Sequence, residues 1–307
     1  AGLYVPENML SELLRLRLII REDALSSWSF VHALFREAVL RHAEDGDRLK
    51  RWSSICADVI KDKHMQVARH ARLLVGAGRS EEALRPLQEA VFAEVSVGEL
   101  GRAKAISELR EQILEPMTID PDGPLALGSR LSALYQVKRG QDTQHTLDEA
   151  KVLIAWAERL EDWQNVAQLH MQTANEHISV GNTTQGEIHL NQSLMIAKKH
   201  RLKARSQILR SMCFFMIRTG DLLQAFNYAR EATLEAEQRG DPYGIAKGLA
   251  MMARVKWQAG EIDIAEFYLN EAAFRHTRIG YRRGLAEVWN TRGELARARG
   301  DLSAAEH

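Results

Sequence analysis

A glycine followed by a polar or acidic residue returns at an almost constant interval from residue 140 onward. The pairs are Gly140-Gln141, Gly181-Asn182, Gly220-Asp221, Gly260-Glu261 and Gly300-Asp301. Consecutive glycines are therefore 41, 39, 40 and 40 residues apart. Seven residues before them stand the small residues Ala133, Ala174, Cys213, Ala253 and Gly293. Self-similarity at a fixed period is the signature of a repeat architecture, in which each unit buries its apolar face on the next.

The residues between these glycines follow a helical pattern, with apolar side chains three and four positions apart. Two such faces are Ile245, Leu249, Met252 and Ala253, and Ile264, Tyr268 and Ala272. Each unit is therefore predicted to be a helical hairpin. At the junction RGDPYG, Gly240 suits the left-handed residue after a helix, Asp241 suits the N-cap of the next, and Pro242 suits its first helical position.

This pattern resembles the tetratricopeptide repeat family, in which an aromatic residue, a small residue, a Gly-Asp turn and two alanines stand at fixed offsets. The matching residues are Trp289 and Gly293 before Gly300-Asp301, Ala225 and Ala232 after Gly220-Asp221, and Ala265 and Ala272 after Gly260-Glu261. The chain departs from the family in its period of about 40 residues, and in having His170, His177, Met216 and Lys256 at the large aromatic positions.

The resemblance implies an all-α fold, a right-handed superhelix of stacked helical hairpins over residues 125–307. The last hairpin is expected to be truncated, because its second helix starts only at GDLSAAEH, and we expect the chain to be a piece of a longer polypeptide. Three of the six prolines fall in EPMTIDPDGP, which predicts a corner or linker at residues 116–124. Residues 63–115 are expected to form irregular helical repeats, with Gly78 at the turn of a hairpin.

Residues 1–62 follow a different order. They are predicted to run from a helix (ENMLSELLRLR) through an apolar strand (LII) and an aromatic strand (WSFV) to a second helix (HALFREAVLRHA). This order is typical of the C-terminal part of a winged-helix domain. The stretch FVHALFREAVL, with the helical segments after it, is similar to signal-transducing ATPases that carry tandem-repeat sensors, such as large LuxR-type and kinase-linked regulators.

That second resemblance implies a sensor arm, in which repeats bind an inducer or a protein partner and control a nucleotide switch. Its matching positions are Phe30, His32, Arg36 and Glu37. His32 and Arg36 are the expected contacts to a nucleotide domain upstream, although they equally suit a role in bracing the wing against its helix. This chain has no GxxxxGK[ST] phosphate loop, so no cofactor is expected in it, and ATP or ADP would bind in the parent protein.

The composition of the chain argues against several classes of function. Forty-one basic residues balance forty-one acidic ones, which gives no global charge for binding nucleic acid or anionic membranes. The longest apolar run, MCFFMI, is too short to span a bilayer, and a cytoplasmic location is expected. Cys56 and Cys213 lie within apolar helical patterns and are predicted to be structural. No nucleophile with an adjacent base is visible, and His170 and His177 lie two helical turns apart, so neither an enzyme nor a metal site is predicted.

A binding surface is predicted where the first helix of each hairpin lines the concave side of the stack. The residues expected there, counted from the repeat glycines, are Asn175, Arg210, Phe214, Arg218, Lys247, Arg254, Trp257 and Asn290. Cationic, amide and aromatic groups together suit a carboxylate or phosphate on an apolar or sugar-like body. The alternative is that Phe214 and Trp257 belong to the core and that the arginines pair with neighbouring glutamates.

Two functions from different classes remain open. The first is a non-catalytic sensor region of a signal-transducing ATPase, which binds an inducer or protein partner. The second is a free-standing repeat adaptor that binds an extended peptide.

Overall fold

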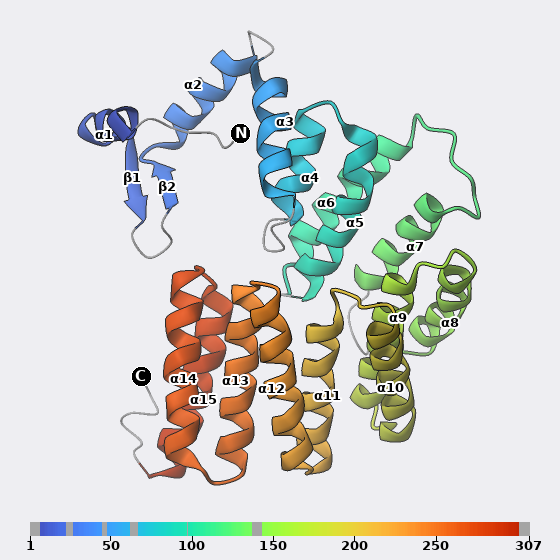
Figure 1. Cartoon of the computed structure of the whole chain (residues 1–307). Coiled ribbons are helices and arrows are strands. Elements are labelled where there is room, and N and C mark those ends of the chain that lie inside the picture. The colour runs from blue at the N-terminus through green and yellow to red at the C-terminus, as the bar shows by residue number, and fades with distance from the viewer. Residues whose placement is uncertain are drawn as a thin grey trace. The chain divides into compact units, whose positions relative to one another are not determined.

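The computed structural model describes residues 7–22, 27–44, 48–61, 67–96, 98–136 and 143–300. It divides into two compact units, Ala1–Ile119 and Asp120–His307, which we call the N-terminal and C-terminal units (Figure 1). The division falls inside the proline-rich segment 116–124. Each unit has its own helices and its own core.

The N-terminal unit begins with the predicted order of helix, two strands and helix. These elements are α1 (Glu7–Arg15), β1 (Ile19–Glu22), β2 (Ser27–Phe30) and α2 (Ala33–Glu44). The two strands pair antiparallel, from Ile19 opposite Phe30 to Glu22 opposite Ser27. The described side chains of α2 are all exposed to some degree, and none of them enters a core.

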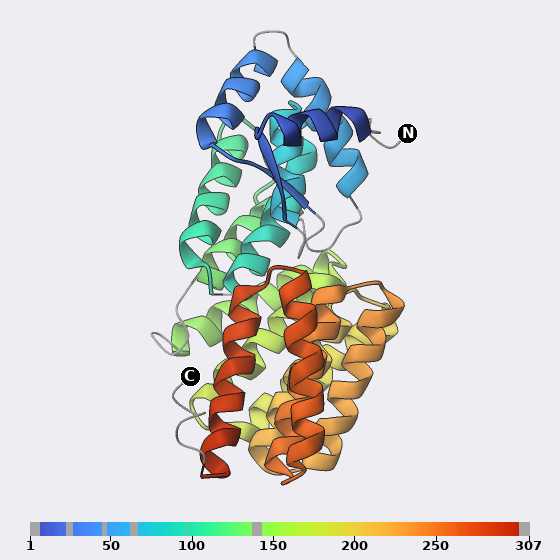
Figure 2. The ribbon, with the colours of Figure 1, turned by 90° about the vertical axis from the view of Figure 1, so that its left-hand side faces the viewer.

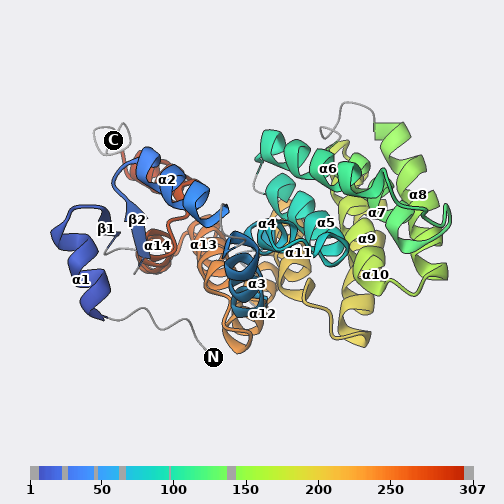
Figure 3. The same cartoon turned by 90° about the horizontal axis from the view of Figure 1, so that it is seen from above.

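Four further helices complete the N-terminal unit. They are α3 (Arg48–Ile60), α4 (Val67–Gly76), α5 (Ser80–Ser96) and α6 (Leu100–Leu114). Ala57 of α3 lies in the same buried cluster as Ala71 of α4 and Leu87 of α5, so α3 packs with the helices that follow it. Figure 3 shows α4, α5 and α6 side by side. Gly78 lies in the turn between α4 and α5 with φ of +75°, a left-handed conformation that glycine adopts without a steric penalty.

The C-terminal unit is a stack of helical hairpins, as predicted. The first helices of the hairpins are α7 (Pro124–Gln136), α9 (Trp163–Ser179), α11 (Arg205–Thr219), α13 (Pro242–Gln258) and α15 (Arg282–Ala298). The second helices are α8 (Thr143–Arg159), α10 (Thr183–Lys199), α12 (Leu222–Gln238) and α14 (Ile262–Arg278). Each helix packs on the next along the chain, and Figure 2 shows α14 and α15 side by side in red. Apolar clusters such as Ala253, Ala265, Leu269 and Val288 join one hairpin to the next.

The repeat glycines occupy the turns inside the hairpins. Gly181, Gly220, Gly260 and Gly300 all have φ between 77° and 87°. Gly140, the first of the series, lies outside the described residues. A second left-handed series, which the sequence pattern did not predict in full, occupies the turns between hairpins. It consists of Glu161, Arg201, Gly240 and Gly280, with φ between 51° and 66°.

Side-chain caps begin several of the helices. The carboxylate or amide oxygens of Asp162, Asn182 and Asp221 accept hydrogen bonds from the backbone N–H three residues later. Asp241 occupies the N-cap of α13, with Pro242 at the first helical position, but its carboxylate makes no capping hydrogen bond. The prediction that Asp241 caps with its carboxylate is therefore wrong, whereas the predicted place of the helix start is correct.

The small-residue series is buried in the middle repeats. Ala174, Cys213 and Ala253 are fully buried, and Gly293 is partly buried. Ala133 is exposed, so the predicted close approach fails there. The reason is the 41-residue spacing between Gly140 and Gly181, which shifts Ala133 by one position, so that the buried Leu134 lies 40 residues before Ala174.

Candidate binding surface

The first helices of successive hairpins form one side of the C-terminal unit. α9 contacts α11, α11 contacts α13, and α13 contacts α15, whereas the second helices make fewer contacts with one another. Helices that approach each other closely lie on the shorter side of a curved stack. We call the solvent-facing side of α9, α11, α13 and α15 the inner face, and the side formed by α10, α12 and α14 the outer face.

The predicted residues form columns along the first helices of the hairpins. Asn175, Phe214 and Arg254 each stand six residues before their repeat glycine. The remaining residues of the set stand two, three, ten or thirteen residues before it: Arg218, Trp257, Arg210, Asn290 and Lys247. Residues of one column lie on neighbouring helices at the same height, so contacts between them connect adjacent repeats.

Exposure divides the predicted set. Phe214, Arg218, Arg254 and Asn290 are exposed, and Asn175, Arg210, Lys247 and Trp257 are partly buried. Trp257 packs against the apolar cluster around Leu269, because its position corresponds to the buried Ile178 and Ile217 of the preceding repeats. Asn290 contacts Glu294 on its own helix, with its Nδ2 3.5 Å from Oε1.

Phe214 and Arg254 meet between α11 and α13. The guanidinium carbon of Arg254 lies 5.7 Å from the centroid of the Phe214 ring. A cation over an aromatic face is attracted by the ring quadrupole. In the part of the chain that the structure describes, Arg254 forms no ion pair with a carboxylate, and the same holds for Arg210 and Arg218.

Lys247 is paired with a carboxylate of the next repeat. Its Nζ lies 2.6 Å from Oε2 of Glu287 on α15 and 5.3 Å from the centroid of the Tyr281 ring. The ion pair joins two repeats in one column, because Lys247 and Glu287 are one period apart in sequence. The charge of Lys247 is therefore already balanced by that of Glu287.

Tyr281 also forms part of an aromatic pair that sequence reasoning missed. Its ring contacts that of Tyr243 edge to face, with centroids 4.9 Å apart, and the two side chains are hydrogen bonded. Burial raises the pKa of Tyr243 well above its usual range. No repeat signal marks this pair, because Tyr243 and Tyr281 are 38 residues apart rather than one full period.

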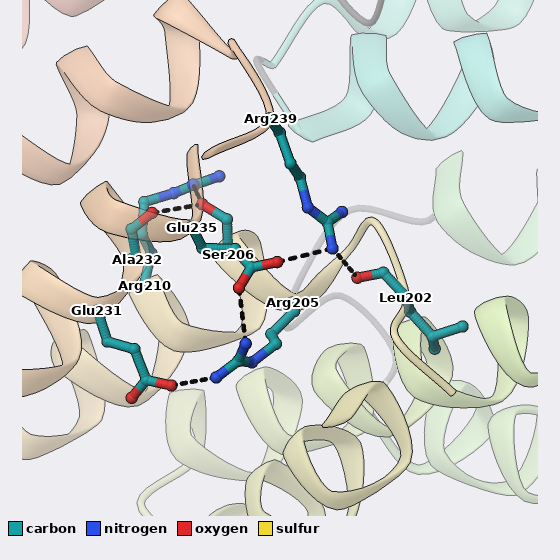
Figure 4. Close-up of polar contacts among 8 residues, drawn as sticks. All are labelled: Leu202, Arg205, Ser206, Arg210, Glu231, Ala232, Glu235 and Arg239. Carbon is teal, nitrogen blue, oxygen red and sulfur yellow. Dashed lines mark hydrogen bonds and ion pairs between the residues drawn. The ribbon is translucent and has the colours of Figure 1, made fainter. Parts of the chain in front are cut away.

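An arginine and glutamate network joins α11, α12 and the turn that precedes α11 (Figure 4). Glu235 accepts a hydrogen bond from Arg205 at 2.6 Å and forms an ion pair with Arg239 at 2.7 Å. Arg205 also pairs with Glu231, and Arg239 donates to the carbonyl oxygen of Leu202 at 2.9 Å. These contacts connect the two ends of one hairpin to the turn before it, which suits a structural role.

Arg210 lies at the edge of this network without joining its ion pairs. Its Nη1 donates to Oγ of Ser206 at 2.9 Å, and that hydroxyl in turn donates to the carbonyl oxygen of Ala232 at 3.0 Å (Figure 4). Burial lowers the pKa of Arg210, although the charges of Tyr243 and Asp241 partly oppose that shift. Its guanidinium is thus desolvated without a carboxylate partner among the described residues.

Three histidines gather on the hairpin formed by α9 and α10. His189 lies between His170, whose Nδ1 is 2.9 Å from its own Nδ1, and His177, whose ring stacks on it. Burial is the main reason why the pKa of each of the three is lowered. Within the described ranges, no group of three or more His, Cys, Asp or Glu side chains is arranged to hold a metal ion.

The two predicted residues of the N-terminal unit are both exposed. His32 precedes α2, and its ring centroid lies 6.2 Å from that of Phe35. Arg36 lies on α2. None of the helices that the structure describes is long and apolar enough to cross a bilayer.

Comparison with known proteins supports the fold. No protein family model matches the chain, and no curated protein matches it. A Rap protein complexed with competence and sporulation factor is similar at a TM-score of 0.52 and 16% identity, over 73% of this chain and 74% of that one. The apo form of RapI is similar at a TM-score of 0.52 and 11% identity, over 84% of this chain and 93% of that one.

A third solved structure is a signal transduction ATPase with numerous domains and a tetratricopeptide repeat sensor, from Pyrococcus horikoshii. It is similar at a TM-score of 0.50 and 14% identity. The match covers 98% of this chain and 57% of that one, so this chain spans little more than half of that protein's length. These likenesses show a tetratricopeptide-like helical repeat fold.

Proposed function

We propose that this chain is the sensor region of a signal-transducing ATPase. In this proposal the inner face binds an inducer or a protein partner, and the N-terminal unit docks on a nucleotide-binding domain of the same polypeptide. The chain itself acts as a binding and coupling element rather than as an enzyme, and ATP or ADP binds in the parent protein.

The observation that carries the binding role is the composition of the inner face between α11 and α13. Phe214 is exposed there, beside Arg254, and Arg210 and Arg218 lie on the same helix as Phe214. None of these three guanidiniums is paired with a carboxylate among the described residues. Exposed aromatic groups and unpaired arginines are enriched where proteins bind their partners.

The docking role is supported by α2 and the strand before it. Phe30, Leu34, Phe35 and Val39 are exposed, and Leu34 exposes 77% of its surface. An amphipathic helix gains its stability by burying its apolar face. A helix with four large apolar side chains in or beside it, and no buried residue among those described, therefore suits contact with a further domain.

Binding to the inner face can be tested with fluorescently labelled peptides. Three peptides of equal length, one acidic, one neutral and one basic, each with one phenylalanine, are titrated against the chain by fluorescence anisotropy. We expect the acidic peptide to bind most tightly. We expect Arg254→Glu to weaken it by about tenfold or more, because the variant replaces attraction by repulsion.

The matched control is Arg230→Glu, which reverses an exposed cation on the second helix α12. The control should bind the acidic peptide as the unchanged chain does. Equal losses in both variants would mean that only net charge matters, and no preference among the three peptides would remove the inner face from the proposal.

The link to an ATPase has its own test, in the sequence that precedes Ala1 in the natural gene. We expect a GxxxxGK[ST] phosphate loop within about 300 residues upstream, the length of one or two domains. An upstream sequence without such a loop would leave the second function, a free-standing adaptor that binds an extended peptide. The adaptor needs only the inner face, so the peptide titration would still apply to it.

A further inference from the structure

We propose that Arg210 anchors an oxyanion, a carboxylate or phosphate group, on the inner face of the C-terminal unit. The proposal rests on the proposed binding function of that face and names the chemical group that is recognised and the residue that recognises it. The proposal is supported by the unused N–H donors of Arg210, by the burial of its guanidinium, by the side chains near it, and by comparison with the other cations of the inner face.

The donors of Arg210 are largely unused. A guanidinium carries five N–H donors in a planar fork. In the described part of the chain the hydrogen bond recorded for them goes from Nη1 to Oγ of Ser206, at 2.9 Å. That bond holds the side chain in one orientation, because Ser206 is itself bound to the carbonyl oxygen of Ala232 on α12. The protein therefore fixes the orientation of the guanidinium, while most of its N–H groups donate no hydrogen bond to a described residue.

The solvation of Arg210 makes this arrangement costly in the free protein. The residue is partly buried, and burial lowers the pKa of its guanidinium. Partly buried arginines are normally paired with carboxylates, as Arg205 is paired with Glu231 and Glu235 one turn earlier on the same helix. Arg210 interacts with the charge of Asp241, yet no carboxylate oxygen of a described residue lies within ion-pair distance of it.

The neighbours of Arg210 suit an anion that carries an apolar body. Phe214 lies one helical turn further along α11, and Arg254 lies against its ring. Two unpaired cations thus flank one exposed aromatic side chain. A guanidinium binds carboxylate and phosphate alike through two parallel N–H donors, so both chemistries fit.

The other cations of the predicted set do not combine these properties. Lys247 is paired with Glu287, and Arg218 is exposed at the last turn of α11. Arg254 is exposed, so water solvates it in the free protein. Only Arg210 in that set is oriented, desolvated and unpaired among the described residues, which distinguishes a recognition residue from a surface charge.

The test uses inorganic phosphate and acetate as probes, at pH 7.5 and at constant ionic strength set with sodium chloride. Differential scanning fluorimetry measures Tm, and isothermal titration calorimetry measures Kd. We expect at least one anion to raise Tm in a saturable way, because a ligand that binds the folded state stabilises it. A response to phosphate alone points to a phosphate group, a response to acetate alone points to a carboxylate, and a response to both points to a site that accepts either oxyanion.

Two variants assign the effect to Arg210. Arg210→Gln should raise Kd by about tenfold or more, since it removes the charged fork. Arg230→Gln, at an exposed cation on the second helix α12, should leave Kd unchanged. Without anion, Arg210→Gln should have a Tm equal to or above that of the unchanged chain, because it removes an unpaired, desolvated charge.

Three results would overturn the proposal. They are the absence of a saturable Tm increase with either anion, equal Kd in Arg210→Gln and the unchanged chain, and a Tm of the anion-free variant several degrees lower, which would indicate a structural arginine. If one of these results is found while the acidic peptide still binds in a way that depends on Arg254, the anion site is refuted and the proposed function stands. If the acidic peptide is no longer preferred but the anion response remains, the proposed function fails and the anion site at Arg210 stands.

Discussion

Nδ1 of His170 lies 2.9 Å from Nδ1 of His189, across the hairpin of α9 and α10. Two facing ring nitrogens share one proton, so the pair requires at least one neutral ring. Burial, with a smaller effect of His189, lowers the pKa of His170 to about 4. In the unfolded chain histidine titrates near ~6.5. The unfolded chain therefore binds more protons than the folded one between these two values.

This relationship predicts how stability depends on pH. The free energy of unfolding is expected to be greatest above pH 6.5 and to fall as the pH drops from about 6.5 towards 4. His170→Leu introduces the residue found at the same repeat position in α11, Leu209. The variant should lose about 2 kcal/mol less than the unchanged chain between pH 7.5 and 5. Urea unfolding at both pH values measures this, and identical losses would contradict it.

His276 provides an internal control for that measurement. It is fully buried on α14, and burial is the main reason why its pKa is lowered to about 4. Because His170→Leu leaves His276 in place, part of the pH dependence should remain in the variant. Complete loss of the pH dependence would mean that His276 does not titrate in this range.

Glu235 is predicted to be the residue on which the arginine network depends. Glu235→Gln removes the charge that balances Arg205 and Arg239, and leaves two partly buried guanidiniums short of a partner. We expect a loss of about 2 to 4 kcal/mol in the free energy of unfolding. Glu231→Gln is the matched variant, because Glu231 binds Arg205 alone and is more exposed, and should cost under about 1 kcal/mol. Equal costs in chemical denaturation would contradict this ranking.

In the turns between hairpins, two residues other than glycine, Glu161 and Arg201, adopt the left-handed conformation that favours glycine. Arg201 has φ of 51°, whereas Gly240 and Gly280 occupy the equivalent turns of later repeats. A left-handed conformation costs a residue with a Cβ about 1 kcal/mol. Arg201→Gly is therefore expected to raise the free energy of unfolding by about 0.5 to 1 kcal/mol. Gly240→Ala should lower it, and a stabilised Gly240→Ala variant would refute the argument.

The two cysteines are predicted to differ in reactivity. Cys213 is fully buried, and burial raises the pKa of its thiol to about 12. Cys56 is only partly buried. Because the thiolate is the reactive form, a thiol reagent at pH 8 should modify Cys56 in the native chain and Cys213 only after unfolding. Cys56→Ser should abolish the native reaction, and rapid labelling of that variant would show that Cys213 becomes accessible in the folded state.

Much of the C-terminal unit followed from residues that act locally. Gly240 adopts the left-handed conformation that its position after a helix predicted. The all-α class, the hairpins and the helix start at Pro242 depend on backbone sterics and on apolar spacing within one helix, which neighbouring residues along the chain decide. At Ala133 the period differs by one residue, so the same local rule predicted a buried side chain where the structure has an exposed one.

The candidate site could be predicted only in part. Counting from the repeat glycines placed Arg210, Phe214 and Arg254 on the correct helices, and the structure brings Phe214 and Arg254 into contact. Counting could not show that Lys247 is paired with Glu287, or that Trp257 packs into a core. The spacing of one period between Lys247 and Glu287 was a usable signal for their ion pair.

The sequence by itself determined the period, the hairpins, the turns and the helices on which the cations stand, because these depend on φ, on helical periodicity and on the identity of single residues. Only the tertiary structure decided which arginine is paired and which is not. Arg205 and Arg210 lie five residues apart on one helix, yet Glu231 and Glu235 of α12 reach the first and not the second. That difference arises from how two helices pack, since ion pairing and desolvation depend on distances between segments far apart along the chain.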